Sequence, residues 1–226
     1  MAETYKTDDE QLDELKKWWR ENGTSTVTTI ALAVAGVFGW QGWQKSQQAE
    51  LDAASAIYQN LLDNAASSAS MSVEQRATAT HLADTLKEDF PNSTYADFAA
   101  LYKARFAVEI KNLPMAESEL RWILDGGATN EIILQTKLRL ARVLYGQEKY
   151  DEALAQLEGD AAAGYAASYA EVRGDIYDAQ GNTEKALLSY QKAKDLNAQA
   201  EKPVANPLLN LKFEQLSSKV AAKGEA

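Results

Sequence analysis

The chain has 226 residues and a formal net charge of −10, from 33 acidic and 23 basic side chains. This acidic composition argues against nucleic acid as a partner, because phosphate binding needs clustered lysine and arginine residues. The chain contains no cysteine and one histidine, His81, which excludes a cysteine nucleophile and a zinc site built on two histidines. We therefore expect no metal and no cofactor.

The first 22 residues form an acidic tail with a few basic residues near its end. Leu12, Leu15 and Trp19 share one face of a helix, so residues 1–22 could lie on the cytoplasmic membrane surface or against a partner. The acidic charge opposes attraction to anionic lipid. A tail that simply continues into the next segment is therefore the alternative.

An uncharged run extends from Asn22 to Gln44. About 20 predominantly apolar residues are enough for a helix to cross a hydrocarbon layer about 30 Å thick. Four of the five tryptophans frame the run: Trp18, Trp19, Trp40 and Trp43. Their spacing places rings at both membrane interfaces, where tryptophan concentrates. The sequence predicts a transmembrane helix over residues 23–44, with a buried hairpin element as the alternative.

Small residues recur within this segment. Ala31, Ala35 and Gly39 follow one another every four residues and so lie on one side of the helix. Such a stripe lets a neighbouring helix approach closely. We expect it either to pack against a membrane partner or to reflect the ordinary composition of a single span.

The basic residues near the span are distributed unequally. Lys16, Lys17 and Arg20 precede it, whereas Lys45 alone follows it closely. This asymmetry predicts a cytoplasmic N-terminus and a C-terminal body outside the cytoplasm. A cleaved signal peptide is disfavoured, because the apolar region starts late, after an acidic tail, and no small-x-small cleavage site follows it.

Beyond the span, helical periodicity alternates with proline and glycine breakers. The predicted helices cover residues 46–64, 73–89, 94–111, 114–125, 129–146, 149–158, 163–180, 183–195 and 206–219. Short turns join them, so consecutive helices should pair. We expect an all-α protein in which residues 45–92 connect the span to a solenoid of helical hairpins over residues 93–226, ending in a capping helix.

A 33-residue period relates two of the predicted hairpins. Ala141 corresponds to Gly174 in the first helices, and Ala153 corresponds to Ala186 in the second. Small side chains at these positions allow the two helices of a hairpin to pack closely, as in a tetratricopeptide repeat (TPR). A more divergent unit over residues 95–127 precedes them, separated by a longer connection.

The order of these features narrows the resemblance. A short acidic tail, one span ending in "GWQGW", and a helical body with "LRLARV" and "GDIYDAQGNTEKALLSYQKA" resemble the YfgM family, the ancillary SecYEG translocon subunits of Gram-negative bacteria. The resemblance implies one inner-membrane span surrounded by lipid, a periplasmic TPR-like domain, and association with SecYEG and with the membrane-anchored periplasmic chaperone PpiD. It further implies a non-enzymatic adaptor in protein export. The alternative is a client-binding chaperone or a regulator of envelope stress signalling.

In TPR-like arrays the first helix of each pair lines a concave groove. Two sets of residues, 33 positions apart, fall on one face of such helices. The candidate groove residues are Leu138, Arg142, Tyr145, Glu171, Asp175 and Asp178, with Arg105 extending the basic side. Such a groove would be mixed in charge and could hold an extended tail or a helix of a partner. The alternative is that these are ordinary solvated helix positions.

Paired carboxylates give little support to catalysis. Asp151 with Glu152, and Asp84 with Glu88, have the spacing of solvent-facing helical residues. No glycine-rich phosphate loop accompanies them. We expect a non-enzymatic protein, with an enzyme that uses only carboxylates as the remaining alternative.

Overall fold

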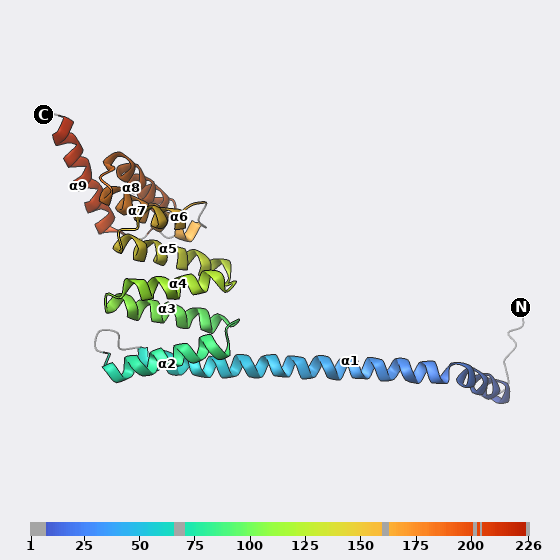
Figure 1. The fold of residues 1–226 in the computed structure, drawn as a ribbon. Helices are drawn as coiled ribbons and strands as arrows, with labels where there is room; N and C mark the ends of the chain where they lie inside the picture. The colour runs from blue at the N-terminus through green and yellow to red at the C-terminus, as the bar shows by residue number, and fades with distance from the viewer. Residues whose placement is uncertain (1–7, 66–70, 160–162, 201–202, 204, 225–226) are drawn as a thin grey trace, which may run out of the picture. The chain divides into compact units, whose positions relative to one another are not determined.

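The structure, a computed structural model, describes residues 8–65, 71–159, 163–200, 203 and 205–224. All regular secondary structure in these residues is helical, which confirms the predicted all-α class (Figure 1). The helices are α1 (Asp8–Ala65), α2 (Val73–Asp89), α3 (Thr94–Glu109), α4 (Leu113–Asp125), α5 (Asn130–Gly146), α6 (Tyr150–Gln156), α7 (Ala163–Ala179), α8 (Thr183–Ala198) and α9 (Pro207–Gly224). The ends of α2 to α8 lie close to the predicted ones, whereas α9 continues past the predicted end at residue 219.

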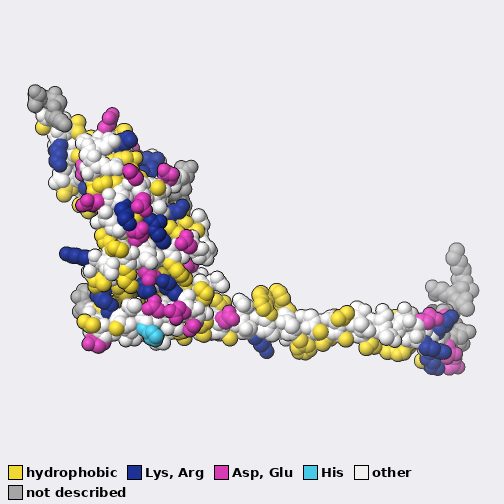
Figure 2. All heavy atoms as spheres, in the orientation of Figure 1, with side chains coloured by type: hydrophobic (Ala, Val, Ile, Leu, Met, Phe, Trp, Pro, Cys, Tyr) yellow, Lys and Arg dark blue, Asp and Glu magenta, His cyan; other side chains and the backbone are white. Residues whose placement is uncertain are grey.

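The first of two structural units, Met1–Ala53, contains most of α1. This helix is unbroken from Asp8 to Ala65, so it includes the predicted span and the predicted helix that follows it. Among the described residues it is the one helix long and apolar enough to cross a membrane. Figure 2 shows charged side chains gathered near its N-terminal end, followed by a long stretch of mostly hydrophobic and uncharged surface.

Two hydroxyl groups near the start of the apolar part of α1 form hydrogen bonds within the helix. Thr28 and Thr29 donate hydrogen bonds to the carbonyls of Thr24 and Ser25, at 2.8 and 2.9 Å. An unpaired hydroxyl is costly in hydrocarbon, so these internal bonds suit a helix surrounded by lipid.

Both ends of the apolar part carry a pair of exposed tryptophan rings. The ring centroids of Trp18 and Trp19 lie 6.3 Å apart, and those of Trp40 and Trp43 lie 5.0 Å apart. The 22 residues from Trp18 to Trp40 correspond to about 33 Å of helix. This length matches the hydrocarbon thickness of a bilayer, about 30 Å.

The second unit, Ala54–Ala226, is a stack of helical hairpins. Each helix from α2 to α8 packs against the next one along the chain. In addition, α3 contacts α5 and α5 contacts α7, so the first helices of successive pairs form one layer. Figure 1 shows α2 to α5 as successive layers of this stack. The arrangement is the predicted solenoid of hairpins, in which each unit buries its apolar face against its neighbours.

One turn conformation closes the three hairpins α3–α4, α5–α6 and α7–α8. Each turn contains a residue with positive φ: Lys111 at 59°, Glu148 at 62° and Gly181 at 75°. The next residue donates its backbone N–H to the carbonyl five residues earlier: Asn112 to Ala107, Lys149 to Leu144 and Asn182 to Tyr177, at 2.8, 2.9 and 2.8 Å. The divergent unit therefore has the same turn as the other two, although only the last turn has the glycine that this conformation favours.

Small side chains hold the two helices of a hairpin close together, as the repeat predicts. Ala141, Ala153 and Ala186 are fully buried. A Cβ added at Gly174 would lie 2.4 Å from the ring of Tyr190 on α8, far inside van der Waals contact. The packing of α7 on α8 therefore depends on the absence of a side chain at this position.

A buried ion network joins α2, α3 and α4. The Glu119 carboxylate, whose side chain is 8% exposed, binds the ammonium groups of Lys87 at 2.5 Å and Lys103 at 2.6 Å. Lys103 is 9% exposed and also binds Asp84 at 2.5 Å. Burial acts to lower the pKa of Lys103, but its hydrogen bonds to Asp84 and Glu119 outweigh burial and raise the pKa. The ammonium group therefore stays charged between three helices.

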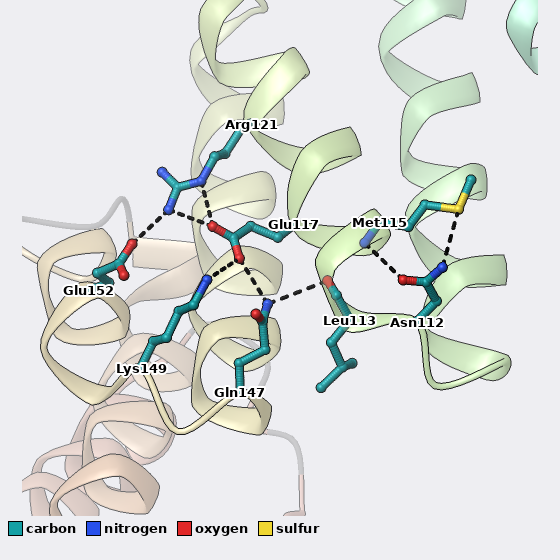
Figure 3. A network of polar contacts seen from close by, with 8 residues as sticks. All are labelled: Asn112, Leu113, Met115, Glu117, Arg121, Gln147, Lys149 and Glu152. Carbon is teal, nitrogen blue, oxygen red and sulfur yellow. Dashed lines mark hydrogen bonds and ion pairs between the residues drawn. The ribbon is translucent and has the colours of Figure 1, made fainter.

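A second network ties α4 to the segment around the α5–α6 turn (Figure 3). The Glu117 carboxylate accepts hydrogen bonds from Arg121 at 2.8 Å, Lys149 at 2.8 Å and Gln147 at 2.9 Å. Arg121 also donates to Glu152 at 2.8 Å. Burial acts to raise the pKa of Glu117, but the three hydrogen bonds outweigh it and lower the pKa from 4.5 to about 2.

The Glu117→Gln substitution is expected to lower the free energy of unfolding at pH 7 by about 1–2 kcal/mol, because a neutral amide holds two cations poorly. The carboxylate has a depressed pKa in the folded chain, so its stabilising contribution is complete above pH 4.5 and is lost as the pH falls towards 2. Thermal unfolding of the full chain in detergent micelles, followed by circular dichroism, should show a Tm difference at pH 7 that closes near pH 2.

The matched control is Glu88→Gln, which changes an exposed glutamate on α2. Its Tm should equal that of the unchanged chain throughout this pH range, since surface charges contribute little. A Tm difference for Glu117→Gln that persists undiminished at pH 2 would show that the carboxylate charge is not the stabilising element.

Candidate partner-binding groove

A groove of 390 Å³ lies between α3, α4 and α5 in the second unit. Its apolar wall is formed by Leu101, Ala104, Val108, Leu113, Leu120 and Val143. Three arginines complete the lining: Arg105 from α3, and Arg139 and Arg142 from α5. The wall can cover hydrophobic side chains of a ligand, and guanidinium groups can bind carboxylate or phosphate oxygens.

Arg105 is held in place by its own helix. Its Nε donates to Glu109, one turn later, at 2.9 Å. Its guanidinium group lies over the rings of Tyr102 and Phe106, 5.5 and 5.7 Å from the ring centroids. Its Nη2 atom is buried and has no acceptor among the described residues. A buried donor without an acceptor costs about 1–3 kcal/mol, so this atom is unsatisfied in the chain alone.

Arg139 and Arg142 lie one turn apart on α5, and neither side chain makes a hydrogen bond or ion pair with another described residue. Burial lowers the pKa of Arg139; Tyr165 acts in the opposite direction, and the nearby cations Arg142 and Arg105 lower the pKa further. Three positive charges thus gather in one groove of a chain whose net charge is −10.

An adjoining hollow of 270 Å³ shares Arg105 and Arg139 with the groove. Its other lining residues are Tyr58, Phe98, Leu101, Tyr102 and Gln135. The ring centroid of Tyr58 lies 5.8 Å from that of Phe98 and 6.4 Å from that of Tyr102. The two arginines therefore stand between an aliphatic surface and an aromatic one.

Two acidic residues of α7 bind α9. Lys212 binds Asp175 at 2.7 Å and Glu171 at 3.2 Å. Asp175 also accepts a hydrogen bond from the hydroxyl of Tyr190 at 2.8 Å, and Glu171 accepts one from Asn206 at 3.0 Å. These two carboxylates are satisfied within the chain.

The structure places the other predicted groove residues in different environments. Arg105 and Arg142 line the same groove, and Tyr145 is exposed further along α5. Leu138 is 7% exposed and belongs to the hydrophobic core. Asp178 is exposed on α7.

Two residues that line the groove or the adjoining hollow were not predicted from the sequence. Arg139 was not singled out, although Arg105, Arg139 and Arg173 follow one another at intervals of 34 residues, one in each first helix. Arg139 could have been predicted from this regular spacing. Tyr58 had no such signal, because it comes from α1 and lies outside the repeated hairpins.

The groove offers groups that can bind a ligand. Its lining residues include neither a nucleophile nor an acid–base pair. No group of three potential metal ligands occurs in the part of the chain that the structure describes. Cations beside apolar walls can hold and orient a ligand, but they do not by themselves transform it.

Comparison with known proteins places most of the chain in one family. The family described as tetratricopeptide repeat-like domain matches residues 16–218, which include both the apolar helix and the hairpins. A Haemophilus influenzae protein named ancillary SecYEG translocon subunit is 30% identical over 203 residues, covering 90% of this chain and 96% of the relative. Proteins of the same name from Aggregatibacter actinomycetemcomitans and Escherichia coli are 31% and 26% identical, over 90% and 95% of this chain and 96% and 99% of those relatives.

No solved structure matches the chain. The sequence matches nevertheless run through the apolar helix and the hairpin stack together, in the order that the sequence predicted. The chain therefore belongs to the YfgM family, the TPR-like family of the ancillary SecYEG translocon subunits.

Proposed function

We propose that this chain is a non-enzymatic accessory subunit of the SecYEG translocon that links protein export to periplasmic chaperones of the PpiD type. One observation carries the proposal. The similarity to the Haemophilus influenzae ancillary SecYEG translocon subunit covers 96% of that protein, so it includes the anchor as well as the domain. An isolated TPR-like domain would support protein binding in general, whereas the anchored form supports a role at the membrane.

The physical role of the anchor is to raise local concentration. A domain tethered beside the translocon meets emerging chains or a neighbouring chaperone at an effective concentration far above that of a free protein. Modest contacts in the groove are then sufficient for function, and they can be released quickly.

The proposed topology is a single span in the inner membrane, with a cytoplasmic N-terminus and a periplasmic domain. Lys16, Lys17 and Arg20 before the span, against Lys45 after it, support this orientation. The tryptophan pairs at both ends of the span would contact the lipid interface.

Within the span, the stripe of Ala31, Ala35 and Gly39 is the proposed contact with a translocon helix. All three residues are exposed on α1, and a Cβ added at Gly39 would meet nothing within 4 Å. A partner helix could therefore approach this side closely.

Photo-crosslinking in intact membranes tests the proposal. A photoreactive phenylalanine analogue at Ala35 should yield adducts with SecY, SecE or SecG, and one at exposed Leu188 on α8 should yield adducts with a periplasmic folding factor. Val37 lies on the opposite side of the span and is 55% exposed, so the same analogue there is the matched control and should give mainly lipid adducts. The absence of any Sec adduct from both span positions would refute the proposal.

Single cysteines verify the orientation in the same membranes, because the natural chain has none. A membrane-impermeant maleimide should label Glu88→Cys in spheroplasts and should label Asp9→Cys only after the membrane is opened. The reverse pattern would place the domain in the cytoplasm and overturn the topology.

The apolar wall of the groove also favours a second function, direct binding of unfolded clients. The full chain in nanodiscs, without SecYEG or another chaperone, distinguishes the two. Suppression of aggregation of an unfolded test protein would support a client-binding chaperone, whereas an inert chain would support the adaptor.

A further inference from the structure

The surroundings of the groove arginines differ from those of three other cations in the hairpin stack. Lys103, Arg121 and Lys212 each bind carboxylates of a neighbouring helix. Arg139 and Arg142 have no such partner among the described residues. The two arginines and Arg105 therefore gather positive charge that no described residue of another helix neutralises.

The 34-residue spacing gives one arginine to each first helix, but the three members have different surroundings. Arg173 donates to the carbonyl of Leu157 at 2.9 Å and so links α7 to the end of α6. Arg105 and Arg139 instead line both the aliphatic groove and the aromatic hollow. The arginine at this repeat position thus links two helices in one unit and lines a hollow in the other two.

The buried Nη2 atom of Arg105 is a second, independent observation. Its burial without an acceptor is unfavourable, because no described residue satisfies it. A ligand carboxylate that draws the guanidinium group towards the groove would let this atom donate a hydrogen bond. Planar guanidinium groups match carboxylates with two parallel hydrogen bonds, which favours arginine over lysine at such a site.

We propose that the groove between α3, α4 and α5 binds a peptide segment that carries a carboxylate beside aliphatic side chains. The carboxylate would lie between Arg105, Arg139 and Arg142, and the aliphatic side chains would lie on the wall that includes Val108 and Val143. This inference rests on the proposed adaptor function, since it names the chemistry of the partner that the groove selects.

The surroundings favour a peptide over a single small anion. A free phosphate would use the three arginines but would leave the aliphatic wall and the aromatic hollow uncovered. An acidic and aliphatic peptide covers both kinds of surface at once, and its sign of charge complements the groove.

Fluorescence anisotropy with the full chain in nanodiscs of zwitterionic lipid tests the proposal. The probe is a fluorescein-labelled decapeptide of alternating leucine and glutamate, blocked at both ends. It should bind, whereas peptides with glutamine in place of glutamate, or serine in place of leucine, should bind at least about tenfold more weakly. Equal binding of the glutamine peptide would overturn the inference.

Variants locate the site on the chain. Arg139→Gln and Arg142→Gln should each weaken binding of the leucine–glutamate peptide about tenfold. Val108→Glu places a carboxylate at an exposed position of the wall and should weaken binding as well. Lys137→Gln removes the same charge from α5 but lies outside the groove, so it should bind like the natural chain. Unchanged affinity in both arginine variants would overturn the inference.

Competition separates a peptide from other sources of anions. Inorganic phosphate and vesicles of phosphatidylglycerol should displace the peptide poorly, and full displacement by either would assign the groove to phosphate or lipid instead. Crosslinking from Ala35 to Sec subunits is independent of the groove. If this crosslink persists in Arg139→Gln while peptide binding is lost, both proposals are supported. If the crosslink is absent in the natural chain, the adaptor function alone is refuted.

Discussion

Replacing Glu119 by alanine is expected to lower the free energy of unfolding of the hairpin stack by about 3 kcal/mol. The substitution leaves the ammonium groups of Lys87 and Lys103 without their shared carboxylate, and Lys103 is only 9% exposed. Removal of one partner from a buried ion pair typically costs about 3–5 kcal/mol. We expect the lower end of this range, because Asp84 still binds Lys103 and is itself 42% exposed.

Circular dichroism of the full chain in detergent micelles measures this effect, since the anchor stays helical in the micelle while the hairpins unfold. For a domain of this size, about 3 kcal/mol corresponds to a Tm lowered by roughly 6–12 °C. The matched control is Glu152→Ala, which removes an ion-pair partner that is 53% exposed and should cost less than about 1 kcal/mol. Equal Tm values for the two variants would show that the buried network does not stabilise the fold.

A double-mutant cycle with Lys103→Met tests the pair directly. Each single change leaves the other residue without its partner. The loss in free energy of unfolding of the double variant should therefore be smaller than the sum of the two single losses by about 1–3 kcal/mol. Additive effects would mean that Lys103 and Glu119 do not interact, in spite of their 2.6 Å separation.

Gly174→Ala is expected to destabilise the α7–α8 hairpin by about 2 kcal/mol. Two effects oppose each other. Alanine is favoured over glycine inside a helix by about 1 kcal/mol. However, the added Cβ would lie 2.4 Å from two ring carbons of Tyr190, which is 2% exposed and hydrogen-bonded to Asp175. Overpacking of such a site costs about 1–3 kcal/mol or more, so the clash should win.

Gly164→Ala is the matched control on the same helix, because a Cβ there would meet nothing within 4 Å. It should leave Tm unchanged or raise it slightly. If Gly174→Ala were as stable as Gly164→Ala, the close approach of α7 and α8 would not depend on the missing side chain. Replacing Tyr190 by leucine in the Gly174→Ala chain should recover part of the lost stability, since a smaller side chain relieves the contact.

The sequence predicts helices and hairpins well because their signals are local. Apolar periodicity, together with breakers such as Pro114, marks the helices α2 to α8 closely. Ala153 and Ala186 lie 33 residues apart, at the same position of two hairpins. This repetition along the chain indicates that small residues there allow close packing. By contrast, the turns at Lys111 and Glu148 lack glycine, so their shared conformation is visible only in the structure.

The side-chain networks could not be predicted, because they form between helices distant in sequence. Glu119 meets Lys87 across 32 positions, and nothing in the neighbourhood of either residue indicates the pairing. The prediction of the groove residues from the sequence has the same limit. Arg142 lines the groove, whereas Glu171 and Asp175, predicted for the same groove, instead bind Lys212 of α9. A helix after the last repeat can change the surface of that repeat without changing its pattern.

The position of α9 has a consequence for self-association. A repeat array has no intrinsic end, because its terminal hairpin exposes a face on which another hairpin could stack. Here Leu209 and Leu216 of α9 are buried against α8 and α7, with Lys212 compensating the charge of Asp175. Within the described residues, α9 thus covers the stacking face of the α7–α8 hairpin, so another copy could stack on this hairpin only by displacing α9.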